Sequence, residues 1–137
     1  LPNLRTLSAR DGYTIDAPCF TSLEPLSGLT NLESLGIIFN DPDPSVPVDL
    51  SPLAGMTQLT SLNLSITNDG DMQVSNLSAL SGLKELRSLE LNVDNLPDIS
   101  ALGNLPNLQT VSIQAWGSAP SDLSALEHVP VVNINER

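Results

Sequence analysis

The residue types that perform catalysis are scarce in this sequence of 137 residues. His128 is the only histidine and Cys19 is the only cysteine, and no serine stands in a nucleophile motif beside a partner base. The sequence has no P-loop, no G-x-G-x-x-G motif and no zinc motif. One cysteine cannot form an internal disulfide or a thiolate metal cluster. We therefore predict no catalytic residue, no metal site and no cofactor, and expect that the chain is not an enzyme.

Acids and aromatic residues are the stronger candidates for binding, because they gather in four short segments, at residues 11–16, 39–44, 67–71 and 115–118. The aromatic residues there are Tyr13, Phe39 and Trp116, and the acids are Asp11, Asp16, Asp41, Asp43, Asp69 and Asp71. Aromatic rings beside carboxylates on projecting loops suit a cationic protein partner. The alternative is that the rings only pack these loops onto the domain. The segment at 68–71 hints at calcium but lacks the spaced ligands of an EF-hand.

The charge balance narrows the choice of partner. Sixteen acids against five bases give a formal net charge of −11. Such a chain is repelled by nucleic acids and by anionic membranes, whose binding depends on Lys and Arg. No apolar run has the length of a membrane helix, and the first residues lack the shape of a signal peptide. We expect another protein as the partner, with a cationic surface or a glycan as options, and no nucleic acid or membrane insertion. Solubility alone also explains the acidity.

The elements that would position these residues follow from the spacing of the leucines. Apolar residues recur in steps of three, three, three, three and two, and the copies begin at Leu23, Leu50, Leu77, Ile99 and Leu123. The periods are 27, 27, 22 and 24 residues, with one step of three missing from the last copy. A partial copy opens the chain at Leu1. Leucine-rich repeats have periods of about 20–29 residues, whereas ankyrin and tetratricopeptide units are longer.

Each copy predicts one coil of a solenoid. A pair such as Leu62 and Leu64 alternates and predicts a short strand, while the steps of three predict 3-10 or single-turn helical segments. One coil cannot cover its own apolar residues, so the coils stack. The predicted fold is an α/β leucine-rich repeat solenoid with a curved parallel sheet on the concave face and short 3-10 or helical turns on the convex face. Residues 1–137 form one domain of about five coils. The copies begin abruptly without caps, so we expect a piece of a longer protein.

Two groups of turn residues recur in the convex segments. Glycine or asparagine lies between the last two apolar residues of each segment, in Ser27-Gly28, Ala54-Gly55, Ser81-Gly82 and Gly103-Asn104, where it tolerates a left-handed backbone. A polar group before each segment, such as Asp49-Leu50-Ser51 or Asp98-Ile99-Ser100, can cap a helical turn by accepting backbone N–H bonds.

The segments Pro25–Leu35 and Asp98–Leu105 resemble bacterial, internalin-type leucine-rich repeats, and the resemblance covers essentially the whole chain. It implies a protein-interaction domain, often on the bacterial surface, that binds its partner on the concave sheet. Three coils are longer than is typical of that family. The asparagine usually found after the strand is irregular: Asn40 and Asn95 are near that position, whereas Thr67 and Trp116 stand in the other copies.

The strand alternation also predicts which residues face solvent on the sheet. This face is small, polar and almost free of aromatic residues, and of the residue types typical of interface hot spots it has only Arg10 and Arg87, both off-centre. Its hydroxyl and amide groups could bind a glycan. The candidate concave residues are Arg10, Ile38, Asn63, Arg87, Glu90, Asn92 and Gln114. The candidate rim residues are Tyr13, Phe39, Asp41, Asp43, Asp69, Asp71 and Trp116.

We therefore predict a protein–protein interaction module from a bacterial surface or secreted protein, located outside the cell or at the cell surface. The alternatives are a carbohydrate or cell-wall binding module and a structural spacer in a multidomain surface protein.

Overall fold

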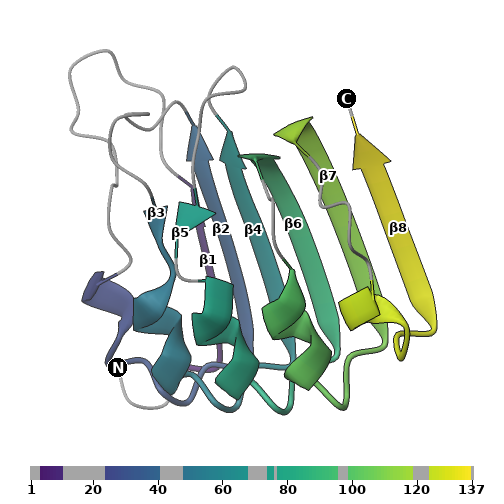
Figure 1. The fold of residues 1–137 in the computed structure, drawn as a ribbon. Helices are drawn as coiled ribbons and strands as arrows, with labels where there is room; N and C mark the ends of the chain where they lie inside the picture. Colours follow the sequence, from purple (N-terminus) through teal and green to yellow (C-terminus); the bar gives the residue numbers. More distant parts are fainter. Residues whose placement is uncertain are drawn as a thin grey trace.

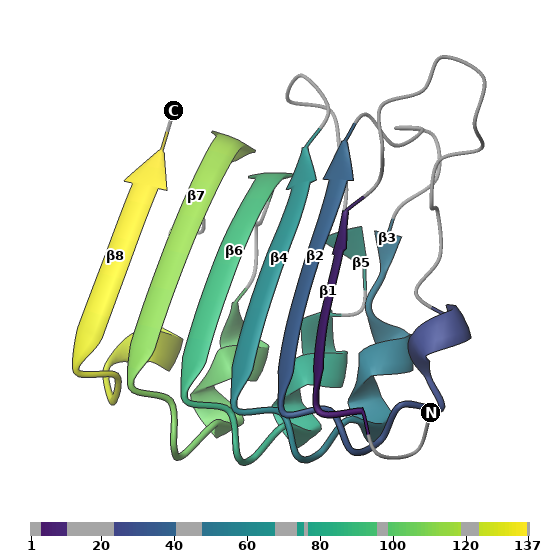
Figure 2. The ribbon, with the colours of Figure 1, turned by 180° about the vertical axis from the view of Figure 1, so that it is seen from behind.

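Six parallel strands line one side of the molecule and short 3-10 helices line the other (Figures 1 and 2). This computed structural model describes residues 4–10, 24–40, 48–67, 74–75, 77–95, 99–118 and 124–136. The strands of the main sheet are β1 (Thr6–Arg10), β2 (Ser34–Asn40), β4 (Ser61–Thr67), β6 (Ser88–Asn95), β7 (Thr110–Ser118) and β8 (Val131–Glu136). The 3-10 helices are η1 (Glu24–Leu26), η2 (Ser51–Gly55), η3 (Leu77–Gly82), η4 (Ser100–Asn104) and η5 (Ser124–Leu126). The predicted leucine-rich repeat solenoid is confirmed.

The strands follow one another in the sheet in chain order, β1-β2-β4-β6-β7-β8, and every pair is parallel. Corresponding residues of successive coils therefore stand side by side, as in the pairing of Ser34 with Ser61 and of Ser61 with Ser88. In the last pair Thr110 meets Val131, 21 positions later. The helices η4 and η5 begin 24 residues apart, as the spacing of the copies predicted, so the missing step of three shortens the coil between η5 and β8.

The steps of three form a continuous series of 3-10 hydrogen bonds. In the coil around η2, the amide nitrogens of Leu53, Met56 and Leu59 donate to Leu50, Leu53 and Met56 carbonyl oxygens at 2.9, 3.0 and 3.1 Å. A 3-10 turn places every third residue on the same side. The apolar residues that make these bonds are therefore also the ones that point into the core, as the spacing predicted.

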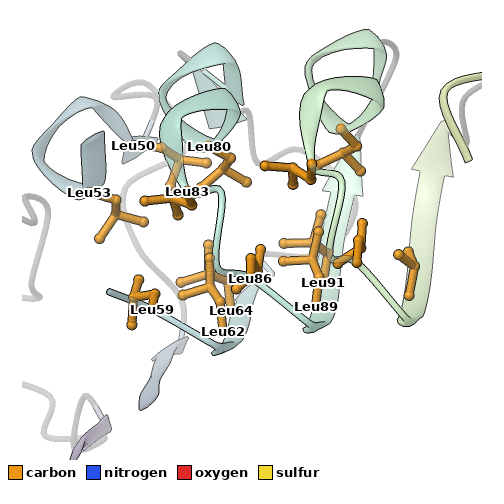
Figure 3. Packing of buried hydrophobic residues seen from close by; sticks show 14 of the residues in the cluster. Leu50, Leu53, Leu59, Leu62, Leu64, Leu80, Leu83, Leu86, Leu89 and Leu91 are labelled. Carbon is orange, nitrogen blue, oxygen red and sulfur yellow. The ribbon is translucent and has the colours of Figure 1, made fainter. Parts of the chain in front are cut away.

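The core lies between the strands and the 3-10 helices, and Figure 3 shows the leucines of neighbouring coils pointing toward one another there. Leu53, Leu59 and Leu64 in one coil and Leu80, Leu86 and Leu91 in the next are almost completely buried. Burying such a side chain stabilises the fold by about 1.5–3 kcal/mol. The coil of β8 differs, since β8 has a neighbour on one side only: Val132 is 37% exposed, whereas its partner Val111 is fully buried.

The glycines of the convex segments do not adopt the left-handed backbone that they tolerate. Gly55, Gly82 and Gly103 lie within η2, η3 and η4, and neither these nor Gly28 has a left-handed φ. The 3-10 turns continue into one another without reversing direction, so no such backbone is needed. A side chain at Gly55 would meet no atom within 4 Å, so space does not require glycine there either.

A small second sheet accompanies the longer coils and was not predicted. It consists of β3 (Val48–Asp49) and β5 (Val74–Ser75), which pair in parallel on the same side of the main sheet as the 3-10 helices (Figures 1 and 2). β3 leads into η2, and the Asp49 carboxylate accepts hydrogen bonds from the Ser51 amide and hydroxyl, both at 2.9 Å. The predicted cap is thus confirmed for this copy; Asp98 and Asp122 of other copies lie outside the described residues.

Candidate functional site

The solvent face of the main sheet consists of three columns, with one residue from each strand, and the first runs Thr6, Ser34, Ser61, Ser88, Thr110 and Val131. The central column runs Ser8, Gly36, Asn63, Glu90, Ser112 and Asn133. The next column runs Arg10, Ile38, Ser65, Asn92, Gln114 and Asn135. The register keeps each column in line because the inward residues between them, such as Leu62 and Leu64, are fixed in the core.

Most of the candidate concave residues share this face. Asn63 and Glu90 are neighbours in the central column, and the Asn63 Nδ2 donates to Glu90 Oε2 at 3.4 Å. Asn92 and Gln114 pair in the next column and are half-buried. Ile38 is a large apolar side chain of the face, 37% exposed, and Val131, in the column of Thr110, is another, 48% exposed. The structure therefore brings together an amide–carboxylate pair, two further amides and an apolar side chain, a set that can donate, accept and make apolar contact.

The two candidate arginines are placed differently. Arg10 ends β1 in the column of Ile38, and its side chain lies outside the description. Arg87 precedes β6 and is exposed at the base of the strands, where its carbonyl oxygen accepts hydrogen bonds from Gln109 and Thr110 amides at 2.8 and 3.1 Å. Arg87 thus belongs to the base of the sheet and not to its solvent face.

The candidate rim remains a prediction. Tyr13, Asp41, Asp43, Asp69 and Asp71 lie outside the described residues, as does the possible calcium segment at 68–71. Phe39 lies in β2 and Trp116 in β7, but the description does not extend to their side chains.

The base of the strands is a second candidate region, where a regular pattern of backbone hydrogen bonds joins the coils. The Arg5 carbonyl oxygen accepts from the Glu33 and Ser34 amides at 2.7 and 3.0 Å, and the Glu33 carbonyl oxygen accepts from the Thr60 and Ser61 amides at 2.8 and 3.1 Å. The Thr60 hydroxyl donates to the same Glu33 oxygen at 3.1 Å. These bonds hold the residues before β1, β2 and β4 in a fixed relation.

A polar hollow of about 460 Å³ lies at this base, lined by Arg5, Asn31, Glu33 and Gln58. The four side chains belong to the coils of β1, β2 and β4, and all are exposed. The Gln58 Nε2 donates to Asn31 Oδ1 at 3.5 Å. Sequence analysis missed this set because its members are far apart in the chain. The only signal is that Asn31 and Glu33 flank the buried Leu32 and that Gln58 precedes the buried Leu59.

Asp94 is a buried polar residue that sequence analysis also missed. Its side chain is 1% exposed near the end of β6, where the pairing with β7 shifts between Val93 and Asn95. Asn95, the residue singled out by the sequence, is only half-buried. The position that Asn95 lies near is occupied by Asp94, which is three residues after Leu91 as Asn40 is after Ile37, and the side chain of Asp94 is buried.

Two kinds of site have no support among the residues that the structure describes. No three of their His, Cys, Asp and Glu side chains come together in a group that could hold a metal ion. No helix among them has the length and apolar character needed to cross a membrane.

Comparisons with known proteins agree with this geometry. No protein-family model and no curated protein sequence matches the chain. Among solved structures, internalin C2 from Listeria monocytogenes is similar over 85% of this chain and 47% of its own, with 30% sequence identity and a TM-score of 0.61. A second Listeria monocytogenes internalin, inlF, is 22% identical over 85% of this chain and 45% of its own, with a TM-score of 0.44.

The chain thus spans about half the length of the internalins that it matches. The similarity to internalin C2 agrees with the in-register parallel sheet and the 3-10 turns described above. The protein is an internalin-like leucine-rich repeat protein.

Proposed function

We propose that the chain is a protein-binding module that engages its partner on the solvent face of the main sheet, centred on Asn63 and Glu90. The observation that carries this proposal is the shared register of the six strands, which places the outward side chains in continuous columns. Ile38 adds an exposed apolar contact beside the amides and the carboxylate. Interfaces combine such an apolar contact with surrounding polar groups. The similarity to internalin C2 supports a binding function over catalysis.

A cationic protein surface fits this face best. Glu90 is exposed near its centre, and the chain as a whole carries a formal charge of −11. A long-range field of this sign increases the association rate of a positively charged partner, and added salt screens it. The internalin-like character also supports a bacterial surface or secreted setting, which completes the proposal.

A photo-crosslinking experiment tests the surface. A photoreactive residue at Ser112, on the sheet face, is compared with one at Ala54, which is exposed on η2 across the core. Each protein is exposed to surface proteins of cells that the parent bacterium contacts. We expect crosslinks to one defined protein from position 112 and none to that protein from position 54. Equal crosslinking from both positions would contradict the proposal.

The partner identified by crosslinking is then purified, and its affinity for variants of the chain measures the contribution of the sheet face. We expect Glu90→Lys combined with Asn63→Ala to weaken binding at least about tenfold, the scale of a hot-spot loss. Ala54→Lys, the control on the other side, should leave binding unchanged, and affinity should fall as salt is raised. If binding survives the pair on the sheet but is lost with Tyr13→Ala and Trp116→Ala, the rim binds the partner and the sheet-face proposal is wrong.

A further inference from the structure

We propose that the polar hollow at the base of β1, β2 and β4 binds a neutral saccharide. This site is separate from the solvent face of the sheet, and the proposal does not depend on the proposed protein-binding function. Its evidence is the set of four side chains that line the hollow: Arg5, Asn31, Glu33 and Gln58.

The chemistry of the lining selects the class of ligand. An Asn or Gln amide offers both donors and an acceptor, a guanidinium offers only donors, and a carboxylate offers only acceptors. The lining is almost entirely polar, which disfavours an apolar ligand. Glu33 opposes a small anion and Arg5 opposes a small cation, so the formal charges of the lining cancel. A sugar hydroxyl both donates and accepts, and neighbouring hydroxyls of a sugar ring can pair with planar groups of this kind.

The size of the hollow agrees with that class. Its volume of about 460 Å³ lies within the range of about 300–1,000 Å³ typical of small-molecule sites. A hollow of this size can accommodate one or two sugar rings.

Buried leucines hold the backbone of the lining residues in place. Leu32, which separates Asn31 from Glu33, is completely buried, and Leu59, which follows Gln58, is also completely buried. These anchors fix the backbone from which the polar side chains project. The Glu33 carbonyl oxygen accepts three hydrogen bonds from the coil of β4, and its amide donates to the coil of β1. The backbone therefore needs little ordering when a ligand binds, and such ordering reduces affinity.

At two corresponding positions of later coils, the side chains make shorter bonds to the previous coil. Asn107 and His128, like Asn31 and Gln58, each precede a buried apolar residue. Asn107 Nδ2 donates to the Lys84 carbonyl oxygen at 2.8 Å, and His128 Nε2 lies 2.9 Å from the Leu105 carbonyl oxygen. Those side chains join one coil to the previous one. The bond from Gln58 to Asn31 also joins two coils, at the longer distance of 3.5 Å, and both side chains border the hollow.

Titration followed by NMR tests the proposal on the whole ¹⁵N-labelled chain. The probes are cellobiose, maltose, lactose and N,N′-diacetylchitobiose, each raised into the millimolar range, with glycine and acetate as charged comparisons. We expect at least one disaccharide to give saturable shifts at the side-chain amides of Asn31 and Gln58. Glycine and acetate should give none. Shifts that do not saturate with any disaccharide, or saturation by glycine or acetate alone, would overturn the proposal.

Variants locate the binding. We expect the double variant Asn31→Ala, Gln58→Ala to weaken disaccharide binding at least about tenfold. Glu33→Gln, which keeps the shape of the side chain, should also weaken it and serves if the double variant folds poorly. Glu85→Ala and Arg87→Ala alter equivalent exposed positions in the coil of β6 and should leave the affinity unchanged. Equal affinity in Glu33→Gln and in the control variants would overturn the assignment to the hollow.

The sugar could come from a free oligosaccharide or from a glycan on a protein. A glycoprotein that binds before, but not after, enzymatic removal of its glycans would identify the second source. Binding that is unaffected by that removal would show that the hollow recognises polypeptide and would overturn the saccharide assignment.

Discussion

The coil that leads into β7 has fewer residues than the coils between β2, β4 and β6, but all of them bury their apolar residues in the same way. From Ser34 to Ser61, and from Ser61 to Ser88, the chain takes 27 residues, whereas from Ser88 to Thr110 it takes 22. The strand register and the buried positions are nevertheless equivalent. In the long coils, part of the chain before the 3-10 helix forms the β3–β5 sheet.

The two regions also differ at the base of the strands. In the short coils a polar side chain such as Asn107 joins its coil to the previous one, while in the long coils Asn31 and Gln58 border a hollow. Repeat proteins gain stability from contacts between neighbouring coils. Length variation thus leaves the core unchanged, whereas the polar side chains beside the core differ in the contacts that they make.

The largest expected loss of stability comes from truncating equivalent core leucines in the two regions. Leu59 is 0% and Leu108 is 2% exposed, and each amide donates to the residue three positions earlier. We expect Leu59→Ala and Leu108→Ala each to lower the free energy of unfolding by about 2–5 kcal/mol, because each leaves a cavity. Urea denaturation followed by circular dichroism measures both.

Their difference is the informative quantity. If the cores are equivalent, the two losses agree within about 1 kcal/mol, and the exposed control Gln109→Ala changes stability by less than about 0.5 kcal/mol. A much larger loss for one leucine, or separate transitions for the two regions, would show that coil length does alter the core.

Asp94 tests the junction between the long and short coils. β6 pairs regularly with β4 through Ile66 and Val93, but its pairing with β7 shifts after Val93. The side chain of Asp94 is 1% exposed there. We expect Asp94→Ala to lower the free energy of unfolding by about 1–3 kcal/mol, because it leaves the polar groups around the carboxylate without their partner. Asn95→Ala, at the half-buried neighbour, should cost less in the same denaturation assay; the opposite order would refute the assignment of Asp94 as the buried repeat position.

The repeat predicted the fold in detail because one physical rule governs it. Residues such as Leu62 and Leu64 must point inward in every coil, so their spacing determines the strands, the 3-10 turns and the register together. The register, in turn, correctly placed outward residues such as Asn63 and Glu90 in one column.

The remaining features were not predictable because they depend on contacts between coils. The hollow combines Arg5, Asn31 and Gln58, which belong to three coils and share no local motif. The repeat spacing marks the position of Asp94, but the shift in pairing between β6 and β7 that accompanies its burial has no local signal. The glycines do not adopt the left-handed backbone that they tolerate, because the 3-10 segments are continuous.

The smallest expected effect concerns the hydrogen bonds at the base of the coils. Asn107→Ala removes the 2.8 Å bond to the Lys84 carbonyl oxygen and should lower the free energy of unfolding by about 0.5–1.5 kcal/mol, the net contribution of one such bond. Gln58→Ala removes only a contact of 3.5 Å, near the limit of hydrogen bonding, between two exposed side chains. We expect a change within about 0.5 kcal/mol there. Thermal and urea unfolding of the two variants measure the difference. Equal losses would mean that Gln58 supports coil stacking as Asn107 does. The proposed difference between the long and the short coils at the base of the strands would then be wrong.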